Sequence, residues 1–151
     1  MKAFRFSLQR VLQLREQDED ARRRELGEIE QQVARQRHQL GRYQAETEAE
    51  WNQFRVLTEQ GVMDVQRMIN SRSYLLGLKL KVSRVVGRLQ ELEQERQERI
   101  KRYIEARKQK RVLELLRDRS HEKWRREMEA EQQREADDFS TMRHRRDREV
   151  S

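Results

Sequence analysis

Three histidines and a series of closely spaced glutamates are the side chains of this sequence best suited to chemistry. Imidazole nitrogens bind metals and move protons near neutral pH, and neighbouring carboxylates such as those within 46–50 can serve as general acids or bases. However, His38, His121 and His144 are too dispersed to suggest a metal cluster. The sequence also lacks a G-x-x-x-x-G-K-[ST] loop, a G-x-G-x-x-G loop and an H-E-x-x-H motif. We therefore expect no catalytic residue, no metal site and no cofactor.

An active site also needs a concave pocket in which polar groups converge, so the elements that this sequence can form matter. Hydrophobic residues make up 34% of the chain and charged residues 42%, against about 45–50% and about 25% in ordinary domains. Proline is absent, and glutamate, glutamine, arginine and leucine, all strong helix formers, dominate. We expect an all-α protein whose long helices bury a narrow seam. Because two paired helices are expected to offer no concavity, we expect no enzyme.

Seam residues recur at steps of three and four residues in two stretches of the chain. The first stretch runs through Leu26, Ile29, Val33, Gln36, Leu40 and Tyr43. The second, read backwards, repeats the same steps through Leu92, Leu89, Val85, Val82, Leu78 and Leu75. This alternation is typical of a left-handed coiled coil, and the opposite directions indicate antiparallel pairing. The match requires a fold-back near residue 59, within Thr58-Glu59-Gln60-Gly61, where the glycine can leave the helix.

The sequence thus predicts a long two-helix antiparallel coiled-coil hairpin that forms a single domain, residues 1–151. Helix one is expected over about residues 4–58 and the turn over about residues 59–61. Helix two, the longer of the two, is expected over about residues 62–147.

The same register predicts what lies at the other end of the hairpin. Apolar residues at the start of helix one, Phe4 to Leu12, fall beside the apolar residues of 112–116. Glu19 falls opposite Arg99, in a polar part of the seam. From about residue 118 the second helix has no partner within the hairpin, and Trp124 in this tail is either an ordinary exposed residue or a docking anchor.

The fold-back end is richer in apolar residues than one seam can hide. Within residues 62–87, Asp64 is the only acid, and three apolar residues, Leu76, Leu80 and Val86, lie off the seam. One alternative is that the hairpin bends or widens to cover them. The other, which we favour, is an exposed partner-binding surface. Basic residues surround this surface: Arg67, Arg72, Lys79, Lys81 and Arg84.

Charge and composition also bear on the location and the partners of the protein. The net charge is +7, and residues 1–61 hold 11 Lys/Arg and 11 Asp/Glu, so the whole excess lies in residues 62–151. A basic excess can suit nucleic acid or an anionic membrane, but here acids alternate with bases along most of the chain. There is no cysteine, no apolar signal region and no stretch of about 18 apolar residues. We expect a cytoplasmic protein, with a peripheral position at a membrane assembly still allowed.

Two blocks of sequence resemble a known family. The first is Phe4 to Leu12, FRFSLQRVL, followed by Leu14-Arg15-Glu16. The second is 106–119, a basic run that leads into Val-Leu-Glu, with an aromatic residue, Trp124, shortly after it and an acidic run at 131–138. Both blocks, the length and the two-helix layout resemble the flagellar export protein FliJ family and, in pattern, its virulence-type secretion counterpart.

This resemblance implies a non-enzymatic component of the flagellar type III protein export apparatus, located at the cytoplasmic face of the inner membrane in the flagellar basal body. Members form an antiparallel coiled coil that resembles the shaft of rotary ATP synthases. The partners that it implies are the hexameric export ATPase, the cytoplasmic domain of the export gate protein and export chaperones, with no nucleic acid among them.

The resemblance also assigns residues to two of these partners. The positions that match the gate-contacting patch are Gln39, Leu40, Tyr43, Tyr74 and Leu78. The chain departs from the family at Glu46 and Lys81, where apolar or small residues are expected. The ATPase-binding end is assigned to Phe4, Phe6, Val112, Leu113, Leu116 and Trp124.

Two other functions compete with this hypothesis: a basic coiled coil that binds nucleic acid or an anionic membrane, and an unrelated scaffold coiled coil. The sequence leaves open whether the export system is flagellar or virulence-type, and whether the chain self-associates.

Overall fold

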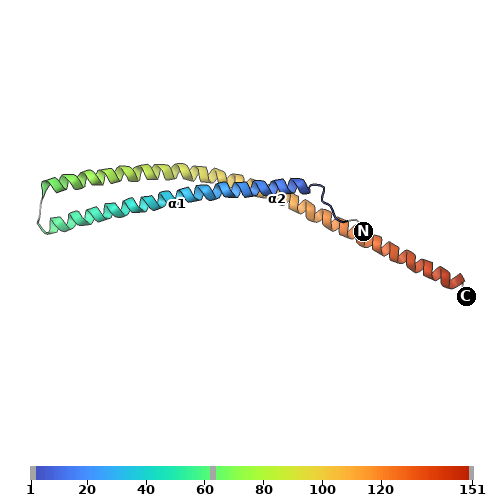
Figure 1. Cartoon of the computed structure of the whole chain (residues 1–151). Coiled ribbons are helices and arrows are strands. Elements are labelled where there is room, and N and C mark those ends of the chain that lie inside the picture. Colours follow the sequence, from blue (N-terminus) through green and yellow to red (C-terminus); the bar gives the residue numbers. More distant parts are fainter. Residues whose placement is uncertain (1–2, 62–63, 150–151) are drawn as a thin grey trace. The chain divides into compact units, whose positions relative to one another are not determined.

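The computed structural model describes residues 3–61 and 64–149, and the regular elements within these ranges are two α-helices (Figure 1). Helix α1 spans Gln9–Glu59 and has 51 residues, and helix α2 spans Val65–Glu149 and has 85. The prediction of an all-α two-helix hairpin with a longer second helix is confirmed. The absence of proline allows helices of this length, because each proline would remove a backbone hydrogen bond and kink the helix.

The chain divides into two compact units, and both helices pass through both of them. We call residues 20–104 the hairpin unit, and residues 1–19 together with 105–151 the terminal unit. The expected single domain stays a prediction.

The hairpin unit contains the fold-back. Gly61 has a φ of 72°, a left-handed conformation that glycine adopts without the steric cost of a Cβ, and its N–H donates to the Thr58 carbonyl at 3.2 Å. Helix α2 starts at Val65, after Asp64, whose side chain accepts from the Gln66 N–H at 3.0 Å as an N-cap. The expected start of helix two at residue 62 falls on residues 62–63, which lie outside the described residues.

The core of the hairpin unit is built from residues of the predicted seam. Ile29, Val33 and Leu92 form a buried cluster against which Leu26 and Leu89 pack. Further towards the fold-back, Leu78 and Val85 are buried in α2. In Figure 1 the two helices run side by side in opposite directions over this unit.

Polar pairs between the helices of this unit follow a slanted pattern. The Ser71 hydroxyl donates to Glu50 at 2.6 Å, and the Arg99 guanidinium donates to the Glu25 carbonyl at 2.6 Å. The predicted pairing puts one α2 position directly opposite each α1 residue. Ser71 lies further along the chain than the position opposite Glu50, and Arg99 lies further along than the position opposite Glu25. Helical side chains lean towards the N-terminus of their own helix, so in an antiparallel pair they lean towards one another, and long side chains meet across displaced positions.

The expected start of helix one at residue 4 was wrong, because α1 begins at Gln9. Residues 3–6 are not helical, and Phe4 and Phe6 are half-buried while Arg5 between them is exposed. That alternation is the side-chain pattern of an extended chain. An extended residue advances about 3.3 Å against 1.5 Å in a helix, so this segment reaches further along α2 than a helical turn could.

The terminal unit has its own small core. Leu12 and Ala106 are buried, and so is Glu19, which is 3% exposed. The Oε2 of Glu19, for which the register predicted Arg99 as the opposite residue, lies 2.7 Å from the ammonium of Lys110. The part of α2 without a partner also begins later than residue 118, because Phe4 packs on His121 and Trp124.

Over residues 3–61 and 64–149, neither helix has a stretch that is long and apolar enough to cross a membrane.

Candidate protein-binding surfaces

One side of the seam in the hairpin unit carries two tyrosines that are held by polar contacts. The Tyr74 hydroxyl donates to Glu46 at 3.1 Å, the Gln39 amide donates to the Tyr43 hydroxyl at 2.8 Å, and the Lys81 ammonium lies 5.6 Å from the centre of the Tyr43 ring. We call Gln39, Tyr43, Glu46, Tyr74 and Lys81 the tyrosine face. Glu46 and Lys81, the two departures from the family pattern, each hold one of the tyrosines.

The two leucines assigned to the gate contact lie at different depths. Leu40 is half-buried, whereas Leu78 is 1% exposed. A side chain so deep in the seam has almost no surface to offer a partner. The assignment of Leu78 to the gate contact stays a prediction, and its burial leaves little surface for such a contact.

The environment of Tyr74 alters its acidity. Partial removal from water is the largest cause that raises the pKa of the phenol above 10.0, followed by the hydrogen bond to Glu46 and the negative charges of Glu46 and Glu50. All of these favour the neutral phenol. At neutral pH Tyr74 therefore stays a hydrogen-bond donor.

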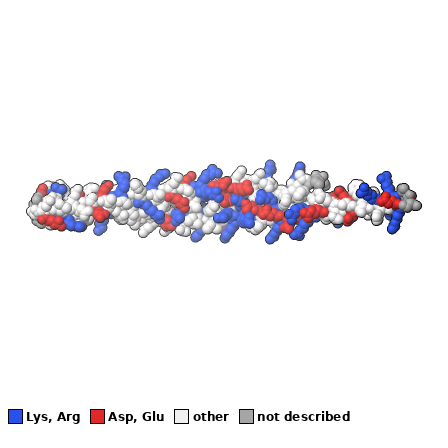
Figure 2. Space-filling view, turned by 90° about the horizontal axis from the view of Figure 1, so that it is seen from below, with Lys and Arg blue, Asp and Glu red and all other residues white. Residues whose placement is uncertain are grey.

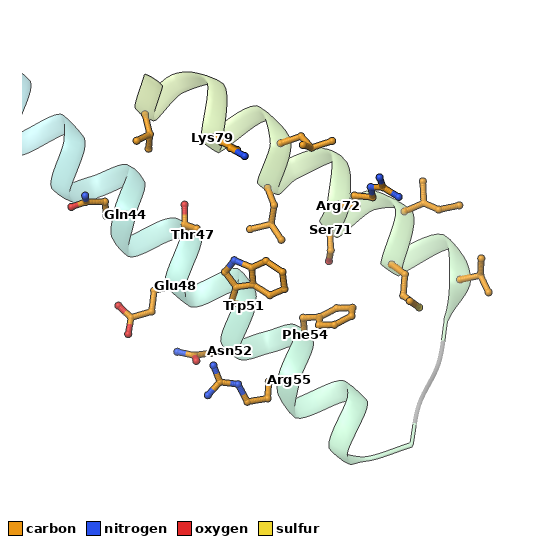
Figure 3. Close-up of a pocket in the computed structure, with 16 residues that line it drawn as sticks. Gln44, Thr47, Glu48, Trp51, Asn52, Phe54, Arg55, Ser71, Arg72 and Lys79 are labelled. Atoms are coloured by element: carbon orange, nitrogen blue, oxygen red, sulfur yellow. The ribbon is translucent and has the colours of Figure 1, made fainter. Parts of the chain in front are cut away.

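The other side of the seam is hollowed into a groove of about 1140 Å³ between α1 and α2 (Figure 3). The expectation that two paired helices offer no concavity was wrong here. Trp51 and Phe54 point into the space between the helices in Figure 3, and Ser71 faces them from α2. Two aromatic rings next to a small residue do not interlock as leucines do, so the apolar surfaces stay partly uncovered.

Helical geometry separates this groove from the tyrosine face. At 3.6 residues per turn, Trp51 lies about 140° around α1 from Glu46, and Lys79 about 160° around α2 from Lys81. Trp51 and Lys79 line the groove, whereas Glu46 and Lys81 contact the tyrosines. The hairpin unit thus carries two distinct surfaces on opposite sides of one seam.

Of the two alternatives for the apolar residues off the seam, the structure favours exposure. Leu76 is 53% exposed, Leu80 63% and Val86 39%. The hairpin does not cover them.

The terminal unit carries an aromatic cluster made of Phe4, His121 and Trp124. The rings of Phe4 and His121 are perpendicular, with their centres 4.9 Å apart, and Trp124 lies 5.9 Å from Phe4 and 5.6 Å from His121. Edge-to-face rings at such distances attract one another beyond their burial. His121 joins this cluster, which sequence reasoning missed, although its position three residues before Trp124 puts both on one helix face.

The other residues assigned to the ATPase-binding end lie in the same unit. Phe6 and Leu113 are half-buried, whereas Val112 is 57% exposed and Leu116 39%. The expected packing of all the apolar residues of this end therefore holds only in part, and Val112 and Leu116 present apolar surface to solvent.

Charged residues of both signs mix over the surface seen in Figure 2. Many of the ion pairs are contacts within one helix, such as Arg126–Glu122 and Lys123–Glu127, which is the pattern of a solvated helix. Among residues 3–61 and 64–149 there is no group of three or more His, Cys, Asp or Glu placed to hold a metal ion. The chemistry that these surfaces offer is recognition through apolar, aromatic and hydrogen-bonding contacts.

Comparison with known protein families gives a match over nearly the whole chain. A family model described as "Flagellar FliJ protein" matches residues 4–149. This range includes Phe4 and Trp124 of the aromatic cluster, the tyrosine face and the groove. No curated protein and no solved structure matches the sequence.

Proposed function

Because the chain belongs to the flagellar FliJ protein family and is thus a component of the flagellar export apparatus, we propose that it acts there as a non-catalytic shaft and adaptor. It binds the hexameric export ATPase, links it to the export gate and receives export chaperones at the cytoplasmic side of the inner membrane. The observation that carries the proposal is the family match over residues 4–149. The mixed charges of Figure 2 do not favour nucleic acid as the partner, because a phosphate backbone is bound by a continuous basic surface.

The terminal unit is the part that we assign to the ATPase. Its aromatic cluster joins the extended segment at Phe4 to α2 at Trp124, and Val112 and Leu116 of the same unit expose further apolar surface. Trp residues are enriched among the few side chains that dominate binding energy. The cluster therefore supports a role for this unit as the tip that enters the ATPase ring.

We expect the purified chain to stimulate ATP hydrolysis by the export ATPase of the same organism. Trp124→Ala removes the ring that packs on Phe4 and His121, and should raise the concentration for half-maximal stimulation about tenfold or more, as at a binding hot spot. Val56→Ala, which truncates an apolar residue in the hairpin unit that is 51% exposed, is the matched control and should stimulate like the original chain. Equal stimulation by the original chain and by Trp124→Ala would show that the ATPase does not contact this cluster. No stimulation by either chain would contradict the proposed shaft function.

The tyrosine face is the surface that we assign to the export gate. Tyr74 is 45% exposed, so its ring can contact a partner while its hydroxyl is held by Glu46. An aromatic ring fixed in this way loses little conformational entropy on binding. Lys81 and Glu46 give the face charges that the family pattern lacks, so the gate of this system should carry groups that complement them.

For the gate contact we expect Tyr74→Ala to weaken binding to the cytoplasmic domain of the gate protein about tenfold, measured by isothermal titration calorimetry. Leu80→Ala, in the same helix and 63% exposed, lies about 120° away around α2 and should leave the affinity within about twofold. If both variants weaken binding alike, the assignment of the tyrosine face is wrong.

A further inference from the structure

The groove opposite the tyrosine face is not used by the function proposed above. It runs along residues 44–55 of α1 and 65–82 of α2. Its volume, about 1140 Å³, exceeds that of ordinary small-molecule sites, which hold about 300–1000 Å³ and a few convergent polar groups. Its length along the helices, about 18 Å on α1 at 1.5 Å per residue, suits a segment of polypeptide better than a metabolite.

The lining of the groove is apolar and open to water. Trp51 is 51% exposed, Ile69 53%, Leu76 53% and Val65 69%. Val65, Ile69 and Leu76 come from α2 and Trp51 from α1, and all four line the same groove. Contiguous apolar surface of this kind is unusual on a monomer and marks a binding site for another apolar surface.

The charged residues that line the groove are mostly basic. Three basic residues line it, Arg55, Arg72 and Lys79, against one acid, Glu48. Among the ion pairs of residues 3–61 and 64–149, none involves these three basic side chains. Residues 65–82 of α2, the stretch that lines the groove, contain four Lys/Arg and no Asp/Glu. An occupant with acidic residues beside an apolar stripe complements this arrangement.

We infer that the groove is a docking site for one amphipathic helix of a partner protein, with an apolar stripe facing Trp51 and Leu76 and acidic residues facing Arg72 and Lys79. A helix laid in such a groove anchors itself through apolar residues at i, i+3, i+4 and i+7, and about 12–18 residues match the length of the two walls. A second copy of this chain fits less well. A two-fold contact would place the same basic surface against itself, with like charges facing across an apolar interface.

The test uses the full chain and synthetic 18-residue helical peptides, with affinity measured by isothermal titration calorimetry. The first peptide has leucines at i, i+3, i+4 and i+7 and flanking glutamates. The second has the same leucines and flanking lysines, and the third has the composition of the first in a scrambled order. We expect the acidic amphipathic peptide to bind at least about tenfold more tightly than either of the others, and to weaken as the salt concentration rises from about 50 to about 500 mM.

Two charge reversals in the same helix then locate the contact. Lys79→Glu places an acid at the groove and should weaken the acidic peptide at least about fivefold while strengthening the lysine peptide. Lys81→Glu makes the same change two residues away on the tyrosine face and should leave both affinities within about twofold. Leu76→Ala, an exposed position, tests the apolar wall and should weaken the acidic peptide about fivefold. Circular dichroism checks that each variant remains as helical as the original chain.

Three results would overturn the inference. The first is no preference of the chain for the acidic amphipathic peptide. The second is an equal effect of Lys79→Glu and Lys81→Glu, which would mean that the charge acts without a defined site. The third is a dimer in sedimentation that Leu76→Ala dissociates, which would make a second copy of the chain the occupant. None of these depends on the export ATPase or the gate, so the function proposed above stands or falls separately.

Discussion

Leu92→Ala should lower the free energy of unfolding by about 2–4 kcal/mol, in the range for buried leucines truncated to alanine. Leu92 is 1% exposed and belongs to the same buried cluster as Ile29 and Val33. In a seam between two helices few neighbours can move in to fill the space, but water lies close by, so we expect the lower and middle parts of the range. Urea unfolding followed by helical circular dichroism measures it.

Leu80→Ala is the matched control for this prediction. Leu80 has the same side chain in the same helix but is 63% exposed. Its truncation removes little buried surface and replaces leucine with the best helix former, so the free energy of unfolding should stay within about 0.5 kcal/mol. Equal losses for both variants would contradict a seam centred on Leu92.

The second large effect concerns the buried carboxylate of the terminal unit. Glu19 is 3% exposed, and its Oε2 lies 2.7 Å from the ammonium of Lys110. Glu19→Gln keeps the shape but removes the charge that faces Lys110. We expect a loss of about 1.5–3 kcal/mol in the free energy of unfolding, the range for a hydrogen bond to a charged group. Lys110 keeps partial contact with water, which limits the penalty below that of a fully buried pair.

A double-mutant cycle separates the pair from other effects of the substitutions. Lys110→Met removes the ammonium, and in that background Glu19→Gln should cost less than in the original chain. The exposed pair Arg126–Glu122 in the same helix is the control, and Glu122→Gln should cost no more than about 0.5 kcal/mol. A coupling energy between Glu19 and Lys110 no larger than the cost of Glu122→Gln in the exposed control pair would contradict the contact.

The same pair gives a pH dependence of known sign. The hydrogen bond to Glu19 is the largest cause that raises the pKa of Lys110 above 10.5, aided by the charges of Glu19, Glu114 and Glu16 and opposed by partial burial. Because the pKa of Lys110 is higher in the folded than in the unfolded chain, the stabilisation is fully present below its pKa in the unfolded chain. It is lost as the pH rises through the pKa of Lys110 in the folded chain. The difference between the original chain and Glu19→Gln should thus be constant from pH 7 to pH 9 and shrink above about pH 10.5.

The sequence allowed the hairpin to be predicted because its signals are periodic and local. The three- and four-residue steps from Leu26 and from Leu92 determine which residues pair, and Gly61 marks the point where the chain must turn. Such patterns follow from helix geometry alone, and the buried cluster of Ile29, Val33 and Leu92 has the predicted composition.

The features that sequence reasoning missed depend on side chains of particular size and reach. Glu19 pairs with Lys110, eleven residues further along α2 than Arg99, the position that the leucine register put opposite it. The lean of long side chains covers only part of this offset, so the pairing could not be read from the leucine steps. The groove exists because Trp51 and Phe54 face Ser71 across the seam, and its volume depends on rotamers. The extended start, in contrast, has a signal in the sequence, since the alternation of Phe4, Arg5 and Phe6 is typical of an extended chain; the prediction of a helix from residue 4 overlooks it.

The slanted polar pairs have a mechanical consequence. In the hairpin unit Tyr74 holds Glu46, Ser71 holds Glu50 and Arg99 holds the Glu25 carbonyl, all with the same lean. These three hydrogen bonds run diagonally between the helices. Sliding one helix past the other in one direction lengthens all three donor–acceptor distances, whereas sliding in the other direction shortens them all. The hairpin unit should therefore resist axial shear unequally in the two directions, a polarity that its nearly symmetric leucine seam does not have.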